Sequence, residues 1–133
     1  MTDEYAYFRV TGSGDSENVT KVMGREPSQS WSEGDPRPRG NSVYSFMKWS
    51  LDSGLEKTVP VEQHIEELFL YLNSKALEIR NLAPDYECLI QCVGNFGSSH
   101  GVHIRPDQVR QAAHMGIGFS MDFYSNEELD NDS

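Results

Sequence analysis

The stretch from residue 60 to residue 83, PVEQHIEELFLYLNSKALEIRNLA, decides the fold of this chain. Its apolar side chains recur every three to four residues and form one stripe: Ile65, Leu68, Phe69, Leu72, Ala76 and Ile79. That spacing places side chains on a single face of a helix, so the segment predicts a long amphipathic helix. Pro60 suits the first turn, and Ala83-Pro84 ends the helix. Because each large apolar side chain contributes about 1.5–3 kcal/mol on burial, we expect this helix to anchor the core against a sheet.

The segments around this helix have the composition and alternation of β-strands. Four strands are predicted, at residues 5–11, 43–51, 86–93 and 117–124, and the last alternates most strictly. In the second strand Val43 is expected to share one face with Met47, Trp49 and Leu51. Glycines at positions 94, 97 and 101 predict a hairpin turn, followed by a short returning strand at residues 102–104.

Two further helices are predicted in the segments that connect these strands. A short helix begins after Asp15 or Ser16 and ends at Gly24, and another runs from Pro106 to Gly116. The order of elements predicts an α+β fold, with a mainly antiparallel sheet of four to five strands packed against two longer helices and one short helix. We expect one domain over residues 1–124, followed by an acidic disordered tail at residues 125–133.

A polar run at residues 25–41, REPSQSWSEGDPRPRGN, separates the first helix from the second strand. A connection of this length without its own secondary structure is usually a functional loop or a disordered one. Trp31, Arg37 and Arg39 are candidate partner-binding residues in it, because tryptophan and arginine are enriched at binding hot spots. The alternative is that Trp31 folds back to cover one edge of the sheet.

The charge of the chain limits the partners it can have. Aspartate and glutamate number 21 against 11 lysines and arginines, a net charge of −10. Phosphate recognition requires lysine and arginine, so nucleic acid and anionic membrane surfaces are not expected partners. A basic protein partner fits this charge. No apolar run approaches the 18 or so residues of a membrane span, and the acidic N-terminus is unlike a signal peptide, so the chain is predicted to be cytoplasmic.

The two cysteines are predicted to be unpaired packing residues. Cys88 and Cys92 lie four positions apart in one predicted strand, where their Cα atoms would be about 13 Å apart. A disulfide requires less than about 7 Å. Free thiols fit a reducing cytosol. No cofactor is expected.

The histidines give only a weak indication of metal chemistry. His100 and His103 differ by an odd offset, which places their side chains on opposite faces of an extended segment unless Gly101 turns the chain. A small metal-dependent or other enzyme with a site near these two residues is therefore the alternative hypothesis. His64 is expected to form a surface pair with Glu67, and His114 to lie at the end of a helix.

In its order of motifs the chain resembles a bacterial family named domain of unknown function 4279. The resemblance runs through Tyr7-Phe8-Arg9-Val10-Thr11-Gly12, Val19-Thr20, Gly24, Pro27-Ser28, Gly34-Asp35, Trp49, Pro60, Tyr86, Pro106, Gly116 and Asp122-Phe123-Tyr124. It implies a small cytoplasmic α+β domain and brings no activity, cofactor or catalytic residue with it. By analogy with other small acidic domains, we expect a non-enzymatic binding protein, of which an immunity-type inhibitor of a basic partner is one kind.

Overall fold

In the computed structural model, which describes residues 3–96 and 101–125, one five-stranded sheet forms the centre of the molecule. Its strands are β1 (Asp3–Gly12), β2 (Gln29–Trp31), β3 (Met47–Asp52), β4 (Glu87–Phe96) and β5 (Ile117–Ser125). Their order across the sheet is β2-β3-β1-β4-β5. The β4–β5 pair is parallel and the other neighbours are antiparallel. The predicted α+β fold with a mainly antiparallel sheet is confirmed.

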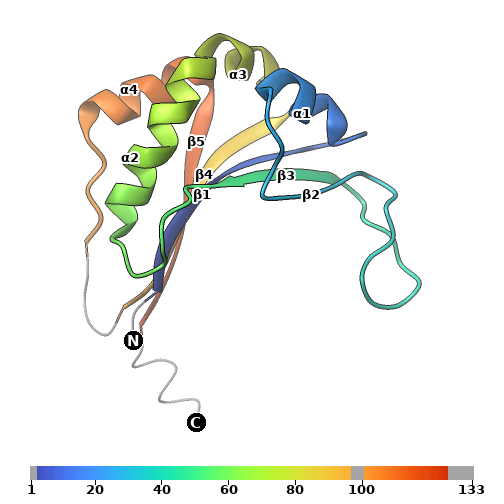
Figure 1. Cartoon of the computed structure of the whole chain (residues 1–133), viewed down its shortest axis with the longest axis horizontal. Helices are drawn as coiled ribbons and strands as arrows, with labels where there is room; N and C mark the ends of the chain where they lie inside the picture. The colour runs from blue at the N-terminus through green and yellow to red at the C-terminus, as the bar shows by residue number, and fades with distance from the viewer. Residues whose placement is uncertain (1–2, 97–100, 126–133) are drawn as a thin grey trace.

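All helices lie on one face of this sheet (Figure 1). They are α1 (Glu17–Met23), α2 (Val61–Leu72), α3 (Ala76–Leu82) and α4 (Pro106–Met115), with a 3-10 turn η1 (Asn73–Lys75) between α2 and α3. The segment predicted as one long helix is thus divided into α2 and α3 by the 3-10 turn η1. No helix of residues 3–96 and 101–125 lies on the other face of the sheet (Figure 1).

The core lies between the sheet and the helices. Alternate residues of β1, among them Phe8 and Val10, are fully buried on the helix side, as is Trp49 of β3. From the stripe that predicted the long helix, the five largest side chains are buried: Ile65, Leu68, Phe69, Leu72 and Ile79. The predicted packing of this helix stripe against the sheet therefore forms the core.

The N-terminus of α2 is capped by a residue of β1. Glu4 is buried, and its Oε1 accepts a hydrogen bond from the Val61 backbone N–H at 3.0 Å. Pro60 at the N-cap position supplies no side-chain hydrogen bond. The carboxylate satisfies a backbone donor that the helix itself leaves unpaired, and it lies at the positive end of the helix dipole. This bond fixes α2 to the sheet.

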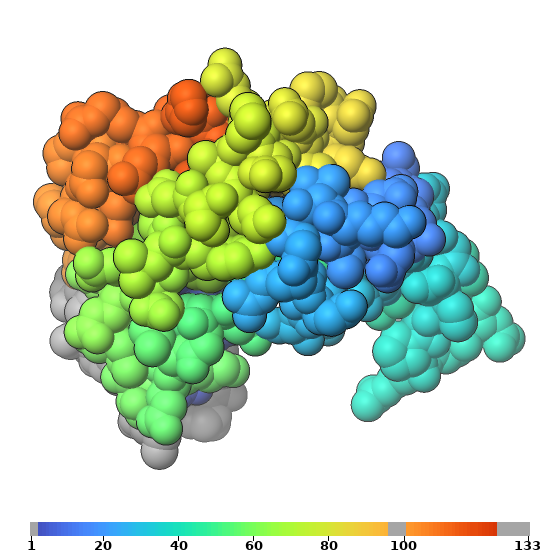
Figure 2. Space-filling view, turned by 45° about the horizontal axis from the view of Figure 1, so that its top comes forward, coloured from blue at the N-terminus to red at the C-terminus, as the bar shows by residue number. Residues whose placement is uncertain are grey.

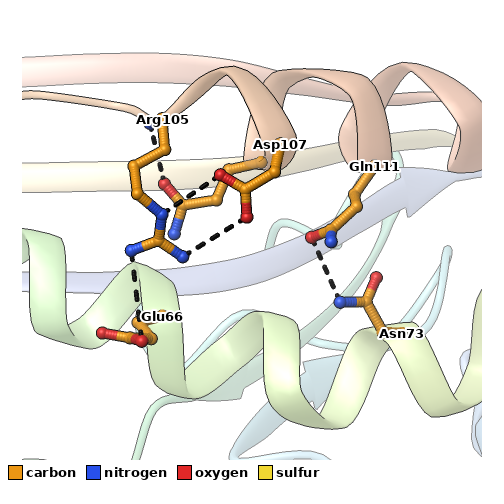
Figure 3. Close-up of polar contacts among 6 residues, drawn as sticks. Glu66, Asn73, Arg105, Asp107 and Gln111 are labelled. Carbon is orange, nitrogen blue, oxygen red and sulfur yellow. Dashed lines mark hydrogen bonds and ion pairs between the residues drawn. The ribbon is translucent and has the colours of Figure 1, made fainter.

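Polar contacts connect α4 and the preceding Arg105 to the neighbouring α2 and η1 (Figure 3). Arg105 lies 4.0 Å from Glu66 and donates to Asp107 at 3.1 Å, while Asn73 donates to Gln111 at 3.1 Å. The Arg105, Glu66 and Asp107 side chains are about half exposed, so their ion pairs add little stability.

The predicted hairpin after residue 93 and the returning strand at residues 102–104 are wrong. Strand β4 continues through Gly94, which is buried and pairs with Glu4 on one side and Phe123 on the other. The chain then crosses through α4 and returns as β5, parallel to β4. A glycine in a strand interior resembles a turn signal in sequence, and here the pairing on both sides overrides it.

The second predicted strand begins later than expected. Strand β3 starts at Met47, and Val43 is 53% exposed, whereas Met47, Trp49 and Leu51 are buried. Residues 43–46 belong to a projecting loop, because Tyr44 and Phe46 pack against Trp31 instead of continuing the ladder. The tail from residue 126 onward lies outside the described residues. Within the described ranges, no helix has both the length and the apolar character to cross a membrane.

Candidate functional site

The uncovered face of the sheet presents aromatic and charged side chains in ordered rows. Cross-strand pairing places Trp31 beside Lys48, and Lys48 beside Thr11. We call this surface the open face. Its members are Trp31, Lys48 and Thr11, then Gln29, Ser50 and Arg9, then Asp52, Tyr7 and Gln91, with Tyr5 beyond them on β1.

Lysine ammonium groups lie over the aromatic rings of the open face. The Lys48 Nζ is 5.2 Å from the ring centroid of Trp31 and 5.5 Å from that of Tyr7. The rings of Tyr5 and Tyr7 lie 6.2 Å apart and nearly parallel, and the Lys57 Nζ is 4.6 Å from the Tyr5 ring. Cation–π contacts of this kind hold the ring faces and the ammonium groups in one layer.

Two cations share the centre of this face. Burial lowers the pKa of Lys48, the positive charge of Arg9 lowers it further, and Asp52 opposes the shift. Burial raises the pKa of Tyr7, against the opposing effect of Arg9. The Arg9 Nε is buried and has no hydrogen-bond partner among the described residues. The centre of the open face therefore concentrates positive charge on a protein whose net charge is −10.

A pocket of about 510 Å³ opens on this face beside the end of β3. Tyr5, Tyr7, Lys48, Asp52, Ser53 and Lys57 are among its lining residues. Both lysines that contact aromatic rings thus also border the pocket. Its size falls within the range of small-molecule sites, about 300–1,000 Å³.

His64 lies at the inner end of this pocket, and the predicted surface pair with Glu67 is wrong. The imidazole is 1% exposed; its Nε2 donates to the Val59 carbonyl at 3.1 Å, and its Nδ1 is 2.5 Å from the Ser53 Oγ. Because a carbonyl can only accept, a neutral ring has its proton on Nε2 and accepts the serine hydroxyl at Nδ1. The Ser53 Oγ also accepts the Leu55 N–H at 3.2 Å. These bonds stabilise the turn between β3 and α2.

The segment of residues 32–46, which we call the arm, projects from the edge of the sheet (Figure 1) and stands clear of the rest of the molecule (Figure 2). Backbone hydrogen bonds cross it, including Tyr44 N–H to Asp35 O at 2.9 Å, and Pro36 forms a β-bridge with Val43. The arm begins immediately after β2. The expectation that residues 25–41 lack secondary structure is therefore wrong, because β2 and half of this ladder lie within them.

The base of the arm is clamped to the turn between β1 and α1. The Ser32 hydroxyl donates to Asp15 Oδ1 at 3.0 Å and accepts the Ser16 N–H at 2.9 Å. Gly14 and Glu33 exchange two hydrogen bonds of 2.9 Å, one through the glutamate side chain. The clamp joins segments that lie far apart in the sequence, and it fixes the direction of the arm.

The three predicted partner-binding residues lie in or beside the arm. Trp31, on β2, is half-buried against Tyr44 and Phe46, the geometry expected if it folds back at the edge of the sheet. Arg37 lies over the Tyr44 ring at 4.8 Å, with its side chain exposed. Arg39 is exposed near the end of the arm. The structure therefore brings Trp31 and Arg37 together through Tyr44 and leaves Arg39 apart from them.

The histidines named as metal candidates do not form a site in the part of the chain that the structure describes. His103 is exposed in the segment before α4, and His100 lies outside the described residues. Among residues 3–96 and 101–125, no three histidine, cysteine, aspartate or glutamate side chains come close enough to hold a metal ion.

The two cysteines are free, as predicted, and buried on the helix side of β4. Burial raises the pKa of Cys88 to about 11 and that of Cys92 to about 12. Because the thiolate is the nucleophilic form, these side chains are unreactive packing residues at neutral pH.

Several residues of this site had no signal of their own in the sequence. In the first predicted strand, Tyr5, Tyr7 and Arg9 alternate with Ala6, Phe8 and Val10, and in the second Lys48 lies between Met47 and Trp49. Sequence periodicity does not give the strand register that pairs these faces. It also does not show that the described helices all pack on the opposite side of the sheet. The polar composition of the Tyr5 to Thr11 face was the one signal that could have marked it as uncovered.

A comparison with protein-family models gives a match over residues 2–126 of the 133-residue chain, to the model described as "Domain of unknown function (DUF4279)". The chain belongs to this family. The DUF4279 match covers all ten helices and strands described above. Neither the curated proteins nor the solved structures contain a significant match. The resemblance inferred from the motifs is confirmed, and any function of this DUF4279 chain has to be argued from its own surface.

Proposed function

We propose that this DUF4279 protein is a non-enzymatic binding protein that captures a basic protein partner with its open face and arm. The observation that carries the proposal is the one-sided covering of the sheet: the uncovered face and the arm together expose or half-expose Tyr5, Tyr7, Trp31, Tyr44 and Phe46. Aromatic and arginine side chains are enriched in interface cores and at hot spots. An immunity-type inhibitor is one protein of this kind.

The charge of the molecule supports a partner that is basic overall. A net charge of −10 accelerates the encounter with a basic protein and weakens that encounter as salt rises. Exposed Asp52, Glu87 and Asp122 lie on the uncovered side of β3, β4 and β5. Basic groups of the partner are expected at these carboxylates, because the centre of the face is occupied by Arg9 and Lys48.

The preformed arm supports high affinity. Its hydrogen bonds, its clamp at Asp15 and its aromatic packing mean that little conformational entropy is lost when a partner docks. The free thiols support a reducing compartment, and we place the protein in the cytoplasm.

Site-specific photocrosslinking in the native cell tests the proposal. A benzophenone amino acid replaces Val43 on the arm in one variant and Leu77 on α3 in a matched control; these side chains are 53% and 68% exposed. We expect one crosslinked protein from position 43, less of it at higher salt in the extract, and none from position 77. No adduct from position 43, or the same adduct from both positions, contradicts the proposal.

A further inference from the structure

We propose that the pocket on the open face binds a small oxyanion ligand, a carboxylate or a phosphate, held by Lys48 and Lys57 in the pocket and by Arg9 beside it, with the Tyr7 ring as its wall. This site concerns a small ligand and does not rest on the proposed protein partner. Three observations carry it: the clustering of like charges, an unsatisfied guanidinium nitrogen, and a pocket of ligand size beside them.

The two cations of the open face lie close together in register. Arg9 pairs with Ser50, and Lys48 lies two residues from Ser50 on the same face, so the two cations are diagonal neighbours. Like charges at such positions repel and destabilise the sheet. Two acidic side chains of the same face, Asp52 at the end of β3 and Glu87 on β4, are diagonal neighbours of Arg9, and both are exposed. An oxyanion between Arg9 and Lys48 would neutralise this repulsion.

The Arg9 side chain retains hydrogen-bonding capacity for such a ligand. Its Nε is buried without a hydrogen-bond partner in the described part of the chain. A buried donor left unpaired is destabilising, so native structures usually satisfy it. Guanidinium groups bind carboxylate and phosphate through paired N–H donors, which would use this nitrogen.

The pocket adds a second lysine to the candidate site. Lys48 and Lys57 both line its volume of about 510 Å³, and the stacked rings of Tyr5 and Tyr7 stand between them. Gln29 lines the same pocket, and its Oε1 accepts a hydrogen bond from the Lys48 Nζ at 3.3 Å, which directs the ammonium group. The arrangement favours an anion with a flat apolar part, which can lie against a tyrosine ring while its charged group meets the cations.

Trp31 provides a local reporter of binding. Its indole N–H donates to the Phe46 carbonyl, and its ring lies 5.2 Å from the Lys48 Nζ, so a ligand that moves this ammonium group changes the indole resonance. Trp49, the other tryptophan, is fully buried on the helix side and donates to Thr20. Its resonance reports whether each variant is folded.

The experiment is a titration of purified protein followed through the two indole N–H resonances. The probes are benzoate and inorganic phosphate, with benzamide as the neutral analogue of benzoate and sodium chloride at equal ionic strength. We expect a saturable shift of Trp31 with benzoate or phosphate, no shift of Trp49, and no response to benzamide. A larger effect of benzoate indicates a carboxylate ligand, and a larger effect of phosphate a phosphorylated one.

Variants then separate binding at the proposed residues from a general salt effect. Lys48→Gln and Arg9→Gln are expected to weaken binding about tenfold or more, since each removes a charge-assisted contact. Lys48→Arg should retain it, and Arg110→Gln on the exposed surface of α4 should change nothing. The proposal is overturned if neither anion shifts Trp31, if benzamide or chloride shifts it equally, or if Lys48→Gln with an unchanged Trp49 resonance binds like wild type.

Discussion

The indole ring of Trp31 stacks on the ring of Tyr44, with centroids 4.0 Å apart and planes 10° from parallel. Phe46 meets the same indole edge-on at 5.6 Å, and its carbonyl accepts the indole N–H at 3.0 Å. Strand β2 has only three residues. Aromatic packing therefore holds the arm to the sheet where strand pairing is short.

A double-mutant cycle at this stack should show coupling. Trp31→Ala and Tyr44→Ala are each expected to lower the free energy of unfolding, and the double variant should lose less than their sum by about 0.5–1.5 kcal/mol. Urea denaturation measures all four proteins. Tyr124→Ala, at a half-exposed tyrosine of β5, is the control and should change little. A coupling energy near zero would mean that the stack does not hold the arm.

Loss of the Glu4 cap should destabilise α2. Glu4→Ala leaves the Val61 N–H without this acceptor and should cost about 0.5–2 kcal/mol, the usual range for a lost N-cap. Glu4→Gln keeps an acceptor oxygen and should lose less. Chemical denaturation of the three proteins checks this, and equal losses for both variants would indicate that the negative charge of Glu4, not the hydrogen bond to Val61, is responsible.

The clamp of the arm should weaken in acid. Hydrogen bonds from the Glu17 N–H and the Ser32 hydroxyl hold the pKa of Asp15 below its ordinary value of 3.8. Because the folded pKa is the lower one, this stabilisation is present above 3.8 and is lost as the pH falls through the folded pKa. The stability difference between wild type and Asp15→Ala should therefore shrink between about pH 6 and about pH 2. A difference independent of pH contradicts the assignment.

The buried thiols should weaken the fold at high pH. The pKa of Cys92 rises from 9.0 to about 12 on folding, so the unfolded chain loses its proton first. The stabilisation is complete below 9.0 and declines as the pH rises toward 12. Unfolding free energies of wild type and Cys92→Ala, measured under reducing conditions from about pH 8 to about pH 10.5, should converge as the pH rises. Parallel curves would show that folding does not raise the pKa of this thiol.

Metal analysis of the purified protein tests the enzyme alternative. A binding protein of the kind proposed is expected to carry metal well below one ion per chain, unchanged in His103→Ala. Stoichiometric zinc or iron that is lost in His103→Ala would instead favour a metal-dependent enzyme with a site near His100 and His103.

Most of the helix and strand positions could be predicted from the sequence, because side-chain periodicity reports which face is buried. Ile117 to Tyr124 alternates and forms β5, and the stripe from Ile65 to Ile79 forms the core side of α2 and α3. The break at η1 was missed because the apolar stripe continues across it through Leu72 and Ala76. Strand β2 was missed because Gln29-Ser30-Trp31 has no alternation; its pairing with β3 is what makes it a strand.

The candidate site could be predicted only in part, because it depends on strand register. Trp31 was recognised as an aromatic residue in a polar setting, but Arg9 and Lys48 become neighbours only when β1 pairs with β3. The role of His64 was also hidden. Its position in the first turn of α2 resembles that of a surface residue, and its burial follows from the turn at Ser53.

Hydroxyl-radical footprinting of the protein alone and bound to the partner identified by crosslinking tests the central claim most directly. The account predicts that oxidation of Tyr7, Trp31 and Tyr44 falls in the complex, while oxidation of the exposed Leu70 and Leu77 on the helix layer stays the same. Protection of these leucines, with the aromatic residues as reactive as in the free protein, would contradict it.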